Sequence, residues 1–147
     1  MLQSNIMNES HLPTLPEIQV LVSYLPRLYA EGFEPILKWE GGFQDKDGTI
    51  HLPYPQYHPL VEEFYGKVTS GGWLDTTYQP KEAYRMLKDE ALVRSASLSQ
   101  IRSMLTFCVR GERFGDGHWA EMIQAGHIRR ILERLIRLSA DLLNPSR

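Results

Sequence analysis

The sequence has a single cysteine and no long apolar run. Cys108, alone among 147 residues, cannot form an internal disulfide, which suits a reducing compartment. No apolar run approaches the roughly 20 residues that a membrane helix needs. The first residues carry no basic segment that leads into an apolar stretch, so we expect no secretion signal. These absences favour a cytoplasmic protein that is not associated with a membrane.

Metal-binding motifs are also missing. The five histidines do not pair at helical spacing, and no Cys-x-x-Cys accompanies them. A zinc site built from His51, His58 and His118 stays open, but we expect no metal and no cofactor. His58 is better placed to cap the helix that begins after it, and His127 to open the last helix, where a neutral ring is favoured.

Lysine is absent from the last third of the chain. Residues 1–96 hold eight Lys and Arg against 13 Asp and Glu, a net −5, whereas residues 97–147 hold eight against five, a net +3. All eight of those basic residues are arginines, whose planar fork suits carboxylate or phosphate. The excess is too small to indicate a nucleic-acid binder by charge alone.

The composition of the sequence indicates one globular domain. A hydrophobic share of 42% and a charged share of 23% are ordinary for a chain that buries its own core. Residues 1–13 are polar and lack periodicity, so we expect a flexible tail followed by a single domain over residues 14–147. Apolar residues recur at helical spacing after Thr14, Pro59, Pro80, Ser97 and His127. Thr14 and Ser97 open capping boxes.

Two other stretches qualify this helical pattern. Pro26 lies inside the first periodic segment and predicts a kink or two shorter helices near Tyr24. Residues 35–55 hold aromatics, paired glycines and a turn at Asp47-Gly48, which predict a small antiparallel hairpin. In it Ile50, Leu52 and Tyr54 alternate as in a half-buried strand. The expected fold is mainly α, with five or six helices and this hairpin against one side.

The stretch VRGERFGDGHWAEMI, residues 109–123, gathers unusual residues. Asp116 is expected to cap a short helix that ends at Gly126. The arginines at 110 and 113, three positions apart, would share a face of a continuing helix. With His118 and free helix amides, Arg110 and Arg113 could hold a phosphate or carboxylate. Alternatively, both arginines pair with neighbouring carboxylates (Glu112, Asp116 or Glu121) and brace the corner.

A catalytic interpretation of the same stretch is also open. A small hydrolase or transferase could use His118 as a general base oriented by Glu112. No nucleophile accompanies them, because Cys108 falls on an apolar stripe where a thiol is buried and inert. We therefore expect a binding module rather than an enzyme.

Aromatic residues interleave with histidines in HLPYPQYHP, residues 51–59. Tyr54 and Tyr57 could stack a base or a sugar. The favoured alternative is that Tyr54, with Trp39 from the opposing strand, fills space between the hairpin and the helices.

The last helix carries a basic band of Arg129, Arg130, Arg134 and Arg137. Glu133 and Arg137 have the spacing of a favourable ion pair, which indicates a solvated face. No Asn, Gln or Ser occurs among residues 127–138 to read bases, so this face is not expected to bind nucleic acid.

The run from residue 104 to 135 resembles the C-terminal signature of an uncharacterised bacterial domain-of-unknown-function family, written Arg-Gly-Glu-Arg-Phe-x-Asp-Gly-His-Trp. The matching positions are Arg110, Gly111, Glu112, Arg113, Phe114, Asp116, Gly117, His118 and Trp119. LPYPQY at residues 52–57 also looks like a family feature, so the resemblance spans most of residues 35–138. It implies no activity.

Together these patterns predict a non-catalytic module that recognises an anionic group, on a nucleotide-like ligand or a partner protein. The ligand-binding residues expected are Arg110, Glu112, Arg113, His118, Tyr54 and Tyr57. A phosphate- or carboxylate-bearing small molecule or protein would be the partner.

Overall fold

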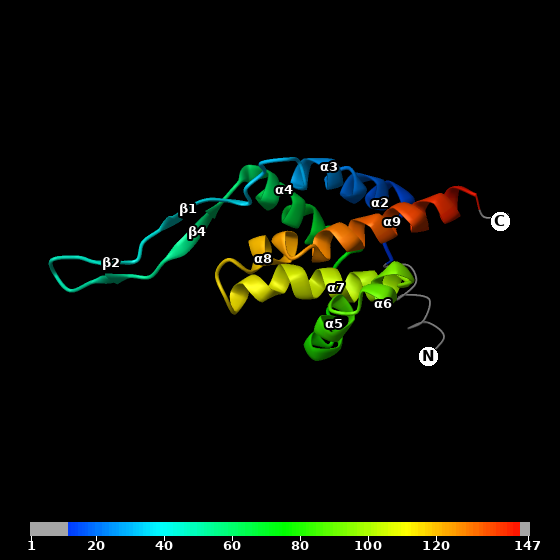
Figure 1. The fold of residues 1–147 in the computed structure, drawn as a ribbon. Coiled ribbons are helices and arrows are strands. Elements are labelled where there is room, and N and C mark those ends of the chain that lie inside the picture. The colour runs from blue at the N-terminus through cyan, green and yellow to red at the C-terminus, as the bar shows by residue number, and fades with distance from the viewer. Residues whose placement is uncertain (1–11, 145–147) are drawn as a thin grey trace.

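A computed structural model describes residues 12–144, so the expected tail of residues 1–13 falls almost wholly outside the described residues. The helices are α2 (Leu15–Val22), α3 (Leu25–Leu28), α4 (Pro59–Val68), α5 (Pro80–Leu87), α6 (Glu90–Arg94), α7 (Leu98–Arg110), the 3-10 turn η1 (Gly111–Arg113), α8 (His118–Gln124) and α9 (His127–Leu143). The strands are β1 (Ile36–Glu40), β2 (Phe43–Gln44), β3 (Ile50–His51) and β4 (Tyr54–Tyr57). The expected fold, mainly α with a small antiparallel hairpin, is confirmed (Figure 1).

The helix starts follow the local sequence signals. Thr14 and Ser97 form complete capping boxes at the starts of α2 and α7. The Nδ1 atom of His58 accepts a hydrogen bond from the Leu60 amide at 3.0 Å, so His58 caps α4 as expected. His127 opens α9, and burial with the nearby Arg130 lowers the pKa of its ring, which favours the neutral form. The side chains of Thr14, Ser97 and His58 satisfy amides that a helix start leaves free.

Two helical segments are divided in the structure, the first near Tyr24 as Pro26 predicted and the second against expectation. The first breaks before Leu25, and the segment that carries Pro26 forms only the single turn α3. The helix that starts at Pro80 ends at Leu87, and α6 begins separately after Asp89, whose carboxylate accepts from the Leu92 amide at 3.1 Å. Proline and a competing cap thus cut helices that the apolar spacing alone joined.

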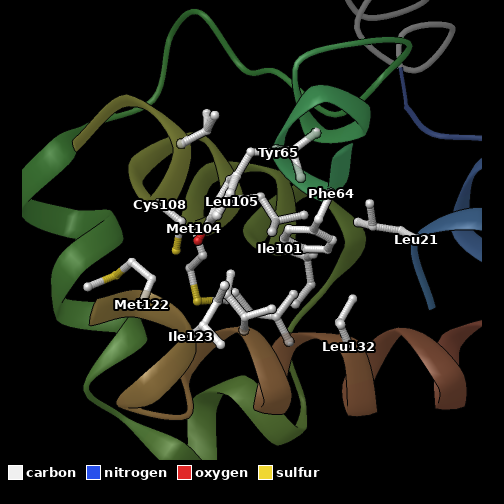
Figure 2. Close-up of a cluster of buried hydrophobic side chains, with 14 of the residues drawn as sticks. Leu21, Phe64, Tyr65, Ile101, Met104, Leu105, Cys108, Met122, Ile123 and Leu132 are labelled. Carbon is white, nitrogen blue, oxygen red and sulfur yellow. The ribbon is translucent and has the colours of Figure 1, made fainter. Parts of the chain in front are cut away.

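The hydrophobic core surrounds α7 (Figure 2). Its inward side chains, which are fully buried, are Ile101, Met104, Leu105 and Cys108. Against them pack Phe64 and Tyr65 of α4, Ile123 of α8 and Leu132 of α9. Burial raises the pKa of the Cys108 thiol, so this cysteine is a core residue as expected. None of the helices in residues 12–144 has both the length and the apolar character needed to cross a membrane.

The hairpin extends from the helices as an arm (Figure 1). Its base pairs β1 with β4, with Ile36 opposite Tyr57, and its far part pairs β2 with β3. The expectation of a half-buried strand is wrong, because Ile50, Leu52 and Tyr54 are exposed by 68%, 75% and 54%. Alternation predicts a strand with two distinct faces, but burial needs a second layer, which the outer arm does not meet.

Candidate functional site

The polar corner lies where α7 passes through η1 into α8. Gly117 precedes α8 in the left-handed conformation, with φ of +94°, which a residue without Cβ adopts without strain. The expected capping by Asp116 is wrong, because no side-chain cap bond forms there. Instead, Glu112 accepts the Gly117 amide at 3.1 Å and the Trp119 amide at 2.8 Å. A carboxylate five residues earlier thus satisfies the start of α8.

Glu112 also joins the hairpin to the corner. The Tyr57 hydroxyl, at the end of β4, donates to Glu112 Oε1 at 2.7 Å. Burial and the adjacent carboxylate raise the pKa of Tyr57, so the phenol stays protonated and keeps donating. Glu112 therefore receives three donors on its two oxygens.

His118 lies on the other side of this junction. A Cβ added at Gly111 would overlap the imidazole, so the ring lies directly on the backbone there. The ring meets Phe107 edge-on, with centroids 5.4 Å apart. His118 Nε2 is buried and has no hydrogen-bond partner among the described residues. No hydrogen bond joins His118 to Glu112 in residues 12–144, so the pairing behind the hydrolase or transferase alternative is not formed.

Arg110 and Arg113 line one hollow of about 380 Å³. The other lining residues are Thr69, Leu74, Val109, Glu112 and Trp119. The Arg110 guanidinium lies 5.5 Å from the centroid of the Tyr78 ring, a cation–π distance. Within residues 12–144, neither arginine forms a salt bridge at 4.0 Å or less, so the expected bracing by ion pairs is not observed.

The Trp119 side chain forms a fixed wall of this hollow. Its indole nitrogen donates to the Val109 carbonyl at 2.9 Å. The ring stacks on Tyr65 with centroids 4.6 Å apart and planes 11° apart. The Tyr65 hydroxyl donates to the Trp119 carbonyl at 3.0 Å. Contacts on both ring and backbone hold this residue in one orientation.

The structure gathers only part of the expected site. Arg110, Glu112 and Arg113 share the hollow, whereas His118, Tyr54 and Tyr57 do not line it. Tyr57 is buried behind Glu112, and Tyr54 lies in β4 opposite Glu40.

The expected filling of space by Trp39 and Tyr54 is also wrong, since both are about half exposed. The six-membered ring of Trp39 lies close to Gly117, at the start of α8. Sequence reasoning missed Thr69 and Leu74 in the lining of the hollow, and Tyr78, which contacts the Arg110 guanidinium. They lie in or beside a loop far along the chain, and no local pattern indicates that it meets α7.

Among residues 12–144, no three His, Cys, Asp or Glu side chains cluster closely enough to hold a metal ion. The hollow at the corner is lined by two arginines, an aromatic ring and one carboxylate, Glu112, which already accepts three hydrogen bonds.

Comparison with models of protein families identifies the family of this chain. The model of a family of unknown function, DUF6508, matches residues 13–141. The chain belongs to this family. The match covers the helices, the hairpin and the polar corner, and it confirms the expected membership of a domain-of-unknown-function family. The searches of curated proteins and of solved structures found no match.

Proposed function

We propose that this DUF6508 chain is a non-catalytic binding module that recognises an anionic group in the hollow beside Arg110 and Arg113. One observation supports this most. Two guanidinium groups without a salt bridge in the described residues line a single hollow, whose one carboxylate, Glu112, already accepts three hydrogen bonds. An arriving phosphate or carboxylate would therefore find unpaired donors and a carboxylate already engaged.

The remaining wall favours an anion attached to an apolar or flat body. Val109, Leu74 and the fixed Trp119 ring supply that surface. A volume of about 380 Å³ is within the range of small-ligand sites. A nucleotide-like ligand fits this combination, and so does an acidic or phosphorylated side chain of a partner protein.

The other residues of the corner would position the site. Glu112 holds the start of α8 and the base of the hairpin in place, and Tyr57 fixes the carboxylate in turn. His118 takes no part in the proposed contact, since it does not line the hollow.

Ligand-induced thermal shifts test the small-ligand form. The wild type is heated with ATP, AMP or inorganic phosphate, beside R110A and R113A. A ligand at a hundred times its dissociation constant adds about 2.7 kcal/mol, which raises Tm by roughly 5–10 °C in a domain of this size. Both variants should shift less than the wild type, because each lacks one of the two guanidinium groups of the hollow.

R27A is the matched control, because Arg27 also stacks on a tyrosine, Tyr24, at 4.5 Å but lies elsewhere. This control should respond as the wild type does. If none of the probes shifts the wild type, the small-ligand form of the proposal fails. Unchanged shifts in R110A and R113A would show that the ligand binds elsewhere.

A further inference from the structure

A second cavity, of about 360 Å³, lies between α6 and α9. All six side chains that line it are charged: Glu90, Arg94, Arg130, Glu133, Arg134 and Arg137. Four positive and two negative groups leave a formal surplus of +2. Its apolar surface comes from the aliphatic stems of these side chains, and no aromatic ring lines it, unlike the hollow beside Trp119.

Two of these arginines are held by uncharged acceptors. Arg134 Nε donates to the Ala96 carbonyl at 2.8 Å. Arg130 Nη2 lies 2.9 Å from His127 Nδ1, and Arg130 Nη1 lies where a Cβ at Gly126 would approach to 2.9 Å. The carbonyl and the neutral imidazole hold the two guanidinium groups in place and add no negative charge beside them. Both side chains are therefore positioned in advance for an anion.

The two carboxylates leave half of the formal positive charge of the lining uncompensated. Glu133 forms its ion pair with Arg129, at 4.0 Å. Among residues 12–144 it forms none with Arg137, the partner that the sequence predicted. Glu90 lies 3.8 Å from Arg130 Nη1, and its side chain is 62% exposed, so solvent screens that pair. Among the residues described, Arg94, Arg134 and Arg137 form no salt bridge.

We propose that the cavity between α6 and α9 binds a small molecule that carries a phosphate group. Several arginine forks converge there, and the fork matches phosphate oxygens in pairs. No aromatic side chain lines the cavity to stack a base, and Glu90 and Glu133 would repel a long polyanion such as nucleic acid. The same carboxylates can accept hydrogen bonds from hydroxyl groups of the ligand.

This site is separate from the hollow beside Arg110. The cavity adjoins the residues just before α7, whereas Arg110 is the last residue of α7. Thirteen helical residues span about 20 Å, so one small ligand does not bridge the two places. The inference therefore does not depend on the proposed function.

Isothermal titration with pyrophosphate tests the proposal. The wild type should bind with a dissociation constant below about 1 mM. The double variant R94Q/R137Q should bind at least about tenfold more weakly, because each lost bond from a charged donor to phosphate is enough for that change. Neither side chain has a hydrogen-bond partner in the described chain, so the variant should stay folded, as thermal unfolding without ligand would check.

K46Q/K81Q is the matched control, since it also removes two positive charges but neither residue lines the cavity. It should bind pyrophosphate as the wild type does. Equal weakening in K46Q/K81Q and R94Q/R137Q would show general charge attraction and overturn the proposal, as would the absence of heat in the wild type.

Two further arms distinguish the alternatives. R110A/R113A should retain the pyrophosphate binding that R94Q/R137Q weakens, and complete loss of binding in R110A/R113A would assign it to the other hollow. A single-stranded oligonucleotide should bind more weakly than pyrophosphate. If it binds more tightly, and its affinity falls steeply with salt, the assignment to a small ligand is overturned.

Discussion

Gly111 is the residue with the least room at the polar corner. Its backbone lies against the His118 imidazole, and an added methyl group would overlap that ring. We expect G111A to lower the free energy of unfolding by about 1–3 kcal/mol, since overpacking forces side chains off their rotamers. Urea unfolding measures this change.

Gly115 supplies the matched control four residues on. Nothing lies within 4 Å of a Cβ added there, and its φ is not in the left-handed region. G115A should be neutral or stabilise by up to about 1 kcal/mol, because alanine restricts the unfolded chain. A cost at Gly115 equal to that at Gly111 would contradict the tight contact with His118.

Glu112 should matter more to stability than any single partner it has. E112A leaves the Gly117 and Trp119 amides and the Tyr57 hydroxyl without their acceptor. We expect a loss of about 2–3 kcal/mol in unfolding free energy, against about 1 kcal/mol for Y57F, which removes only one donor. Equal losses in the two variants, measured by urea unfolding, would show that the amide contacts of Glu112 contribute little.

The same corner shows what the sequence could predict at the scale of residues. The polar residues of the corner were identifiable, because the stretch holds more charged groups than local structure needs. Their partners were not. Asp116 is adjacent in sequence and looked like the cap, yet η1 turns the chain so that Glu112 reaches the amides first. Tyr78 is distant in sequence, so its contact with Arg110 depends wholly on tertiary packing.

At the scale of elements, the outer hairpin is the part least supported by the rest of the molecule. Leu52 and Ile50 expose most of their surface, whereas Tyr57 at the base is buried. Amide hydrogen exchange should therefore be fast at β2 and β3 and slow, near the limit of global unfolding, in the middle of α7. Protection of β2 equal to that of α7 would contradict this description of the arm.

A substitution pair checks the same feature. L52S should change the free energy of unfolding by less than about 0.5 kcal/mol, as expected for an exposed side chain. I101A, in the fully buried face of α7, should cost about 2–5 kcal/mol. A large loss from L52S would show that the arm packs against the helices in solution.

The helices could be predicted from the sequence more fully than the hairpin. Capping boxes at Thr14 and Ser97 and the prolines at 59 and 80 are local signals, and the starts of these four helices were predicted, whereas the start of α6 after Asp89 was not. The alternation in the hairpin likewise predicted strands. Which strand face is covered depends on the direction in which the arm leaves the helices, and no local pattern encodes that direction.

For the whole molecule, α7 joins two charged regions of different chemistry. Its start adjoins the all-charged cavity of α6 and α9, and its end leads to the hollow with a Trp119 wall. Five arginines of the last third of the sequence are divided between these two places, Arg110 and Arg113 at the hollow and Arg130, Arg134 and Arg137 at the cavity.

The molecule as a whole should lose stability at high pH, because several tyrosines are buried. Burial raises the pKa of Tyr29 to about 12, and its hydroxyl donates to the Ile123 carbonyl at 2.7 Å. The folded pKa exceeds the unfolded value near 10, so the stabilising contribution is complete below pH 10 and is lost as pH rises toward 12.

Y29F should therefore cost about 1 kcal/mol of unfolding free energy at neutral pH and make the decline above pH 10 less steep. Urea unfolding at several pH values between 8 and about 11 measures both effects, with Y84F as a control at an exposed position. Tyr65 is fully buried and its pKa is also raised, so part of the decline should remain in Y29F. An unchanged slope in Y29F would show that Tyr29 ionises as readily in the folded chain as in the unfolded one.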